Sequence, residues 1–233
     1  MTADGTSAGA RTSVFVLAVP KGRILNELKP VLTRADIRPD DALFDESSRA
    51  LRFKTDRRNL DIVRVRSFDV ATYVAFGAAQ IGIAGSDVID EFGYSEIYSP
   101  VDLGIARCRL VVAEPASLLT ADNPGRWSHV RVATKYPRRT RRHFAERGVH
   151  AECVVLSGAM ELAPQLELCD RIVDLVDTGV TLKANGLQVV EQIAEVSARL
   201  IVNRSALKLN PEQLGALIAA FRAPAGHDRS VRG

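Results

Sequence analysis

The sequence predicts an α/β protein with mostly parallel sheets. Short apolar runs alternate along the chain with stretches whose apolar residues recur at helical spacing, which is typical of proteins built from strand–helix units. The 233 residues fall between one large domain and two small ones, since domains usually have roughly 100–200 residues, and two lobes fit this length. Ligands in such folds bind beyond the carboxyl ends of strands, so we expect the site in the loops that follow strands.

The elements follow in order along the chain. The first apolar run, 14–19, predicts a buried strand that ends at Pro20, and a helix follows from about Ile24. Further strands are predicted at 51–54, 60–66, 79–84, 101–105, 110–113, 130–133, 153–156, 172–176 and 198–203. Further helices are predicted at 67–76, 88–91, 141–147, 160–166, 182–192 and 211–222. Residues 1–13 and 223–233 are expected to be a disordered extension and a flexible tail.

Composition argues against several classes of function. The 31 basic and 28 acidic residues nearly balance, so the net charge of +3 does not indicate nucleic-acid or membrane binding. Residues 1–13 lack the apolar segment of a secretory signal, and no apolar run approaches the roughly 20 residues that cross a bilayer, so we expect a soluble cytoplasmic protein. Cys108, Cys153 and Cys169 have no CxxC spacing, which argues against disulfides and zinc and favours buried structural thiols.

The most informative segment is IVDLVDTGVTLKANGL, at 172–187. An apolar strand that carries Asp174 and Asp177 runs directly into a Thr-Gly-Val-Thr loop and then into a predicted helix. Gly179 lets the backbone turn so that successive amides can point at phosphate oxygens, and the carboxylates can accept ribose hydroxyls. The alternative is a threonine-capped helix that follows a strand for local reasons alone. We favour the anion cradle because two acids and a buried strand precede the loop.

Two further loops carry cations. In AVPKGRIL, at 18–25, Lys21 and Arg23 flank a glycine after the first strand, and this pair suits pyrophosphate as well as it suits a solvated turn. Arg49 and Arg52 lie in a polar segment at the start of the next predicted strand. Either could reach a cleft, and the default interpretation is that both are ordinary surface arginines. The loop ATKYPRRTRRHF, at 133–144, is more basic still. A triphosphate could use part of it, a solvated helix face explains the rest, and one short cluster is weak evidence for nucleic acid.

Together these segments closely resemble those of ATP phosphoribosyltransferases, in the correct order from about residue 14 to 207. The matching stretches are AVPKGRIL, FDVATYVAFGAAQIGIAGSDV, LGIARCRLVVA, RVATKYPRRTRRHF, SGAMELAP, IVDLVDTGVTLKANGL and SARLIVNRSALK. The resemblance implies transfer of the 5-phosphoribosyl group from phosphoribosyl pyrophosphate to N1 of the ATP adenine, the first step of L-histidine biosynthesis. It also implies two lobes resembling type II periplasmic binding proteins, with the active site in the cleft between them. The first lobe would comprise 14–102 and 181–222, and the second 103–180.

The resemblance assigns roles to particular residues. It implies that phosphoribosyl pyrophosphate is bound by Glu161, Asp174, Asp177, Thr178, Gly179, Val180 and Thr181. From the residues alone, Glu161 could equally serve only the helix dipole. The catalytic residues are expected to be Lys21, Arg23 and Arg49, and the ATP-binding residues Lys21, Arg23, Lys135 and Tyr136. Magnesium is expected to arrive with the substrates rather than at a metal site of the protein.

The partner is expected from the same resemblance. Long-form members carry a regulatory domain after the last shared segment, and this sequence ends about 26 residues after Leu207, so we expect the short form. Short-form members form a hetero-oligomer, inhibited by histidine, with a regulatory subunit resembling a histidyl-tRNA synthetase. Gln80 and Ser86 stand where family members often have an acid and a lysine, and we assign them no role. The rival hypothesis is a solute-binding or sensor module of the same fold.

Overall fold

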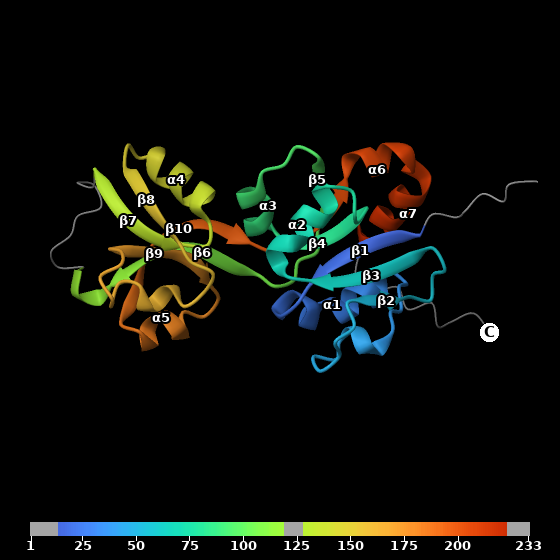
Figure 1. The fold of residues 1–233 in the computed structure, drawn as a ribbon, viewed down its shortest axis with the longest axis horizontal. Helices are drawn as coiled ribbons and strands as arrows, with labels where there is room; N and C mark the ends of the chain where they lie inside the picture. The colour runs from blue at the N-terminus through green and yellow to red at the C-terminus, as the bar shows by residue number, and fades with distance from the viewer. Residues whose placement is uncertain (1–13, 119–127, 223–233) are drawn as a thin grey trace, which may run out of the picture.

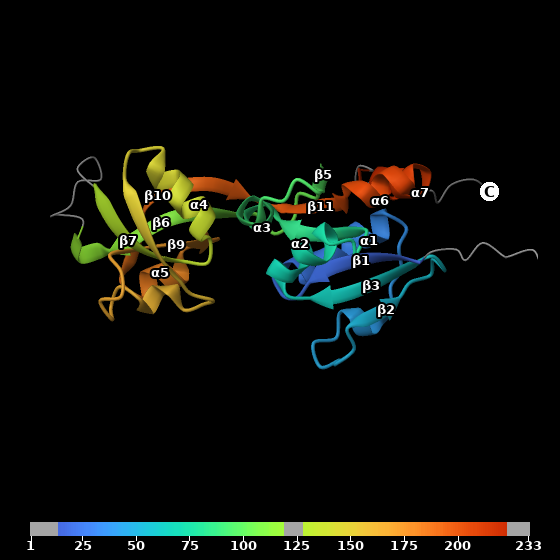
Figure 2. The same cartoon turned by 45° about the horizontal axis from the view of Figure 1, so that its top comes forward.

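The chain forms two lobes, each built on its own sheet (Figures 1 and 2). The computed structural model describes residues 14–118 and 128–222. The predictions for 1–13 and 223–233 lie outside the described residues. None of the helices within the described ranges is long and apolar enough to cross a membrane.

The first lobe holds a six-stranded sheet. Its strands in spatial order are β2 (Arg52–Lys54), β3 (Leu60–Val65), β1 (Phe15–Pro20), β4 (Ile81–Gly85), β11 (Ala198–Asn203) and β5 (Ile97–Asp102). Its helices are α1 (Arg23–Arg34), α2 (Ser67–Ala75), α3 (Ser86–Phe92), α6 (Arg204–Leu209) and α7 (Pro211–Arg222), with the short η1 (Asp41–Leu43). In α1, Leu25, Leu28 and Leu32 recur at helical spacing, so one face of the helix is apolar. This face packs with α7 on one side of the sheet, and α2 and α3 pack on the other side.

The second lobe holds a five-stranded sheet. Its spatial order is β10 (Leu187–Val196), β6 (Cys108–Pro115), β9 (Arg171–Val176), β7 (His129–Thr134) and β8 (His150–Val155). Helix α4 (Pro137–Ala145) inserts Phe144 into the core on one face. The short η4 (Met160–Leu162) and α5 (Val180–Ala184) contribute Met160 and Leu182 to the core on the other face. A further short turn, η2 (Ala116–Leu118), follows β6.

The chain passes between the lobes twice, and the two crossings lie side by side. It leaves the first lobe after β5 through residues 103–107 and returns at Ser197, between β10 and β11. The Leu103 amide donates to the Ala198 carbonyl, and the Ala198 amide to the Ile105 carbonyl, each at 3.0 Å. Ala106 has a φ of 52°, a left-handed conformation that is uncommon outside glycine. These paired crossings, joined by hydrogen bonds, connect the two lobes.

The return crossing corrects the predicted division of the chain. Residues 181–196 were expected in the first lobe and 182–192 as a helix, but α5 ends at Ala184 and β10 pairs antiparallel with β6 in the second sheet. Two register irregularities in β10, at Val189/Glu191 and Gln192/Ala194, disturb its alternation. The apolar residues Val190, Ile193 and Val196 therefore fall three apart, which imitates a helix.

The remaining differences are smaller. Only four of the nine strand pairings among the described residues are parallel, so the sheets are mixed rather than mostly parallel. The predicted helix at 160–166 is only the short η4, and the predicted strand at 101–105 is β5, which begins at Ile97. The parallel strands β1, β3 and β4 in one sheet and β7, β8 and β9 in the other still place their following loops together, as the site requires.

Candidate functional site

The loop after β9 forms a small polar pocket. Gly179 takes a φ of 79°, which an L side chain would adopt only with strain, and it turns the chain from β9 into α5. The pocket has a volume of about 230 Å³. It is lined by Glu161, Asp174, Leu175, Val176, Asp177, Thr178, Gly179, Val180, Thr181 and Leu182. All seven residues predicted to bind the phosphoribosyl ligand therefore lie around one hollow, which we call the cradle.

Asp174 is the most perturbed carboxyl group of the cradle. Burial raises its pKa to about 6, although the Leu175 amide donates to Oδ1 at 2.8 Å and favours the charged form. The neighbouring Glu161 raises the pKa further and Lys135 lowers it. Asp174 is thus ionised at pH 8 and largely protonated at pH 5, within a pocket made of hydroxyls and backbone amides.

A larger cleft of about 950 Å³ is lined by both lobes. Its cations are Lys21, Arg66 and Lys135, which come directly after β1, β3 and β7. Lys21 is held by its own amide, which donates to the Val65 carbonyl at 3.0 Å. Arg66 is not among the residues predicted for the site, yet its position after a strand parallel to β1 matches that of Lys21. That shared position is the signal that could have identified it.

Tyr136 does not line this cleft. Its side chain is 3% exposed, and its hydroxyl donates across the lobes to Asp87 Oδ2 at 2.8 Å. Thr134 fixes the turn, because its Oγ1 accepts the Tyr136 amide and donates to the Val173 carbonyl, both at 2.9 Å. Lys135, between these two residues, reaches the cleft. Burial raises the pKa of both Asp87 and Tyr136.

Replacing Tyr136 by Phe is expected to destabilise the protein more at pH 8 than at pH 5. At pH 8 the variant keeps a buried Asp87 carboxylate that has lost its phenol donor, which costs about 1–3 kcal/mol. Because the folded-state pKa of Asp87 is already raised, protonation relieves this cost as the pH falls. Urea unfolding at both pH values measures the difference, with Tyr73→Phe, at an exposed tyrosine, as the control. Equal losses at both pH values would contradict this explanation.

Arg23 connects the cradle with the first lobe and with a crossing. Its Nη1 lies 3.0 Å from Asp177 Oδ2, its Nη2 donates to the Arg107 carbonyl at 2.9 Å, and its Nε donates to Glu27 Oε1 at 3.1 Å. Each nitrogen of the guanidinium is thus directed to a different part of the molecule. The residue predicted for pyrophosphate therefore lies at the edge of the cradle predicted for phosphoribose.

Arg49 lies in the loop between η1 and β2. It lines neither the cradle nor the larger cleft. The buried Arg64 stabilises this loop. Its guanidinium donates to the carbonyls of Leu43, Asp45 and Ser48 at 2.7, 2.9 and 2.7 Å. Sequence reasoning missed Arg64, although an arginine within the apolar strand Leu60–Val65 was a signal.

Replacing Arg64 by Met is expected to lower the free energy of unfolding by about 2–4 kcal/mol, because these three carbonyls and that of Ala50 lose their shared charged donor. The loop that carries Arg49 should also become more open to proteases. Urea unfolding and limited proteolysis measure the two effects. Arg58→Met, at an exposed arginine, is the matched control. A variant as stable as the control would show that the loop does not depend on Arg64.

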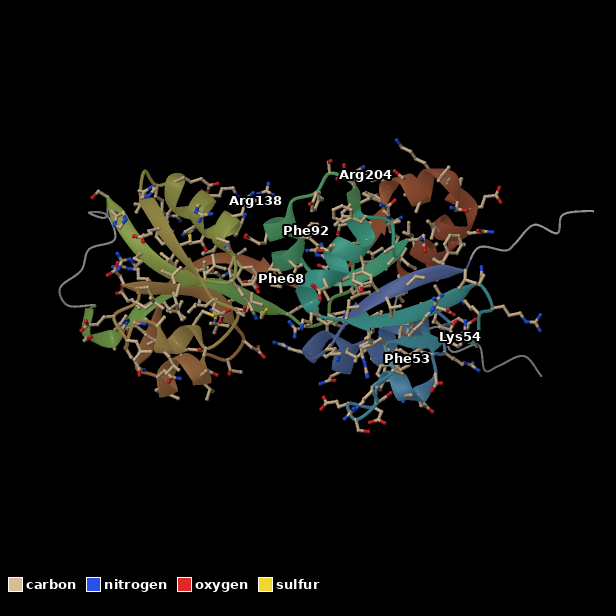
Figure 3. The ribbon with its side chains drawn as sticks, in the orientation of Figure 1. Phe53, Lys54, Phe68, Phe92, Arg138 and Arg204 are labelled. Atoms are coloured by element: carbon tan, nitrogen blue, oxygen red, sulfur yellow. The ribbon has the colours of Figure 1, made fainter. Side chains whose placement is uncertain are left out.

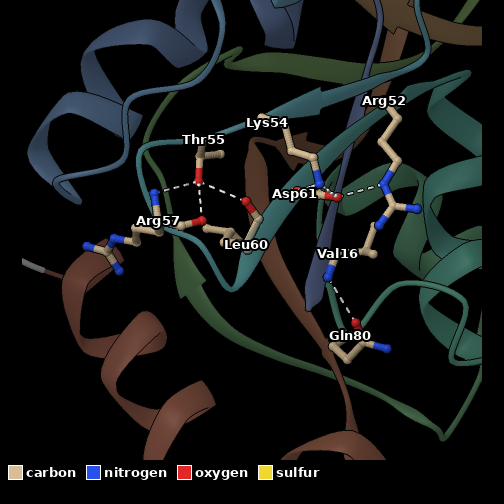
Figure 4. A network of polar contacts seen from close by, with 8 residues as sticks. All are labelled: Val16, Arg52, Lys54, Thr55, Arg57, Leu60, Asp61 and Gln80. Carbon is tan, nitrogen blue, oxygen red and sulfur yellow. Dashed lines mark hydrogen bonds and ion pairs between the residues drawn. The ribbon is translucent and has the colours of Figure 1, made fainter. Parts of the chain in front are cut away.

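Arg52 forms an ion pair with Asp61 instead of facing a ligand pocket. Asp61 is buried in β3, and its Oδ2 accepts Arg52 Nε at 2.7 Å and Lys54 Nζ at 3.0 Å (Figure 4). The same view shows Gln80 Oε1 accepting the Val16 amide at 2.9 Å. Gln80 immediately precedes β4, so this hydrogen bond connects the start of β4 to β1. Ser86 similarly accepts the Ser197 amide at 3.3 Å, next to the return crossing.

The basic loop is partly used between the lobes. Glu91 of α3 accepts the backbone amides of Arg138 and Arg139, at 2.8 and 2.9 Å, at the start of α4. Arg138 also donates from Nη1 to the Phe92 carbonyl at 3.2 Å, and Figure 3 shows these two residues on facing helices. Two of the arginines first considered for a triphosphate thus join the lobes.

The described residues contain neither an activated cysteine nor a cluster of metal ligands. Cys108, Cys153 and Cys169 are free, and burial raises the pKa of each thiol, that of Cys108 to about 11. A thiol with such a pKa is a poor nucleophile. Across 14–118 and 128–222, no group of three or more His, Cys, Asp and Glu residues could hold a metal ion.

Comparisons with known proteins agree with this arrangement. The family model "HisG: ATP phosphoribosyltransferase" matches residues 66–223. The "ATP phosphoribosyltransferase" of Paramagnetospirillum magneticum is 63% identical over 212 residues, which cover 91% of this chain and 97% of that protein. The solved "ATP phosphoribosyl transferase (HisG:HisZ) complex from Thermotoga maritima" matches with a TM-score of 0.73 and 29% identity, over 90% of this chain and 97% of that chain.

A more distant match concerns the fold alone. The periplasmic aliphatic sulphonate binding protein SsuA of Escherichia coli aligns with a TM-score of 0.51 and 12% identity, over 90% of this chain and 71% of that chain. The predicted α/β fold, with two lobes resembling periplasmic binding proteins, is thereby confirmed.

Proposed function

The chain belongs to the ATP phosphoribosyltransferase family, and we propose that it binds both substrates of that reaction between its lobes. The reaction transfers the 5-phosphoribosyl group of phosphoribosyl pyrophosphate to N1 of the ATP adenine and releases pyrophosphate, as the first step of histidine biosynthesis. One observation carries the placement of the substrates. The cradle and the basic cleft are neighbours, because a pocket beside Arg23 shares Asp177 with the cradle and Ser67 with the cleft.

The cradle would bind the phosphoribosyl group. The amides and hydroxyls of Thr178, Gly179 and Thr181 suit the 5′-phosphate, because they present several donors in a tight turn. The carboxylates of Asp174, Asp177 and Glu161 suit the ribose hydroxyls. Val180 contributes its backbone, since its side chain is 69% exposed.

Lys21, Arg23 and Arg49 would bind pyrophosphate, and Lys21, Arg23 and Lys135 the phosphates of ATP. All four side chains are cations and none of them is buried, so their charge is accessible to an anionic ligand. For Tyr136, which was predicted to contact ATP, we propose that it positions Lys135 instead. Its buried hydrogen bond to Asp87 holds the neighbouring Lys135 at the cleft.

The chemistry needs alignment more than a base. Adenine N1 is unprotonated at neutral pH, so it can attack the anomeric carbon as the bond from that carbon to pyrophosphate breaks. No proton has to be removed from N1. The protein would hold the two reactants in line and stabilise the charge that develops on pyrophosphate. Arg23 is suited to this task because its guanidinium lies at the edge of the cradle.

We propose that magnesium enters with the substrates. The ion usually keeps several waters and binds one or two carboxylates together with substrate phosphates. Asp174 and Asp177 in the cradle fit that pattern, whereas the described residues offer no cluster of three ligands. When bound, magnesium would neutralise part of the pyrophosphate charge.

We also propose a regulatory subunit resembling a histidyl-tRNA synthetase as the partner in a hetero-oligomer. The Thermotoga maritima relative was solved as a HisG:HisZ complex, and this chain covers 97% of that relative. The cytoplasm is the proposed compartment, because three free cysteines suit a reducing environment.

The test is pyrophosphate release from ATP and phosphoribosyl pyrophosphate. Purified chain, with and without a candidate regulatory subunit, is assayed with each substrate or magnesium omitted in turn. Release that requires both substrates, with phosphoribosyl-ATP as the product, supports the proposal. If no release occurs with the regulatory subunit present, the reaction is refuted for this chain and a binding protein of the same fold becomes the better hypothesis.

A further inference from the structure

Glu27 lies one helical turn after Arg23 on α1, and its two carboxylate oxygens serve different parts of the chain. Oε1 accepts Arg23 Nε at 3.1 Å. Oε2 accepts the backbone amide of Ala106 at 2.8 Å, from a residue 79 positions away. An ordinary surface ion pair one turn apart on a helix contributes little to stability. The second contact makes this carboxylate more than such a pair.

Ala106 belongs to the crossing that leaves the first lobe. It is 7% exposed, and its φ of 52° places an alanine in the left-handed region. The neighbouring Leu103 and Ile105 are hydrogen-bonded to Ala198 of the return crossing. By accepting the Ala106 amide, Glu27 connects α1 to this crossing.

Arg23 is then held from three directions. Glu27 belongs to the first lobe, the Arg107 carbonyl to the crossing, and Asp177 to the cradle of the second lobe. A pyrophosphate group entering beside the cradle would compete with Asp177 for Nη1, because both are anions. Nε and Nη2 would remain bound to Glu27 and Arg107, so the guanidinium would keep its orientation while one nitrogen changes partner.

We propose that Glu27 is a positioning residue, which orients Arg23 toward the cradle and links that orientation to the crossing at Ala106. The proposal rests on the proposed role of Arg23 in binding pyrophosphate. The pKa of Glu27 is lowered, first by the Ala106 amide and then by Arg23, so the carboxylate stays charged at the pH of the assay.

Two substitutions separate the contacts. Glu27→Gln retains a carbonyl oxygen for the Ala106 amide but removes the charge that Arg23 faces. Glu27→Ala removes both contacts. We expect Glu27→Gln to lower kcat about tenfold with less than about a threefold change in KM for phosphoribosyl pyrophosphate, as expected when a group that meets the leaving group is misplaced. Glu27→Ala should lower kcat at least as much and also increase cleavage by proteases at the crossing.

The decisive measurement is a double-mutant cycle with Arg23→Ala, read as kcat and as calorimetric affinity for inorganic pyrophosphate. In the Arg23→Ala background, Glu27→Gln should change neither quantity by more than about twofold, because the residue acts through Arg23. Glu212→Gln, an exposed glutamate on α7, is the control.

Two results would overturn the proposal. One is a Glu27→Gln variant equal to the unsubstituted chain in both quantities. The other is an equal loss in the presence and absence of Arg23, which would show a purely structural role. If the unsubstituted chain releases no pyrophosphate from the two substrates, the proposed function fails, and the cycle measured on pyrophosphate affinity still decides the role of Glu27.

Discussion

Replacing Asp174 by Asn is expected to make the protein more stable at pH 8 and roughly 100-fold less active. The activity should fall because an amide cannot supply the negative charge that the phosphoribosyl group and its developing positive charge would meet in the cradle. The fold should persist, because the asparagine carbonyl can still accept the Leu175 amide. Asp174 would thus be kept for function at the expense of stability.

The gain in stability should depend on pH in a defined direction. Burial raises the folded-state pKa of Asp174 from its usual 3.8 to about 6, so the folded protein binds the proton more tightly than the unfolded chain. The cost of keeping the group ionised is absent below about pH 4, grows between pH 4 and 6, and is complete above pH 6. Two pKa units correspond to about 3 kcal/mol, which Asp174→Asn should recover at pH 8 and not at pH 4.

Urea unfolding at pH 4, 6 and 8 measures this gain, and Asp41→Asn, at an exposed aspartate, is the control. In parallel, kcat/KM for phosphoribosyl pyrophosphate in the unsubstituted enzyme should fall as the pH drops through about 6, and Asp174→Asn should lack that step. An asparagine variant that is less stable at pH 8, or that keeps the pH step, would refute the role given to this carboxyl group.

Replacing Arg23 by Ala is expected to lower kcat roughly 100- to 1,000-fold, the usual effect of removing one donor that stabilises developing charge. Stability should change by less than about 1 kcal/mol, because Arg23 and its partners Glu27 and Asp177 are all substantially exposed. Arg23→Lys keeps the charge but not the planar set of donors, so we expect an intermediate loss. Steady-state kinetics and urea unfolding separate the two effects.

Arg34→Ala is the matched control, because Arg34 ends the same helix and is exposed. If Arg23→Ala lowered the free energy of unfolding and left kcat within a factor of about three, the role of Arg23 would be to hold the two lobes together. Its contact with Asp177 would then be the whole of its function.

The cradle could be predicted from the sequence because its residues are nearly contiguous. Asp174, Asp177 and Gly179 lie within six positions, so the local pattern of strand, turn and hydroxyls already describes the pocket. The cations of the cleft were partly predictable for a related reason, since each follows a strand. Lys21 was identified in this way, and Arg66 satisfied the same rule without being recognised.

Contacts between distant residues could not be predicted. Tyr136 was expected to bind ATP from the family resemblance, but its side chain is buried and its hydroxyl bonds to Asp87, which lies 49 positions away. The helical pattern of β10 was misleading because bulges changed its period, and the lobe boundary moved with it. The spacing of apolar residues predicts a helix or a strand correctly only where the segment has no bulges.

The paired crossings also set the order in which the chain can fold during synthesis. The second sheet is built from one continuous stretch, β6 to β10, and is complete once residue 196 has been made. The first sheet must wait for β11, which lies between β4 and β5, so β4 keeps an unpaired edge until residues 198–203 leave the ribosome. The first lobe therefore cannot complete its sheet before the second lobe has been synthesised, and until then the edge of β4 is open to wrong strand partners.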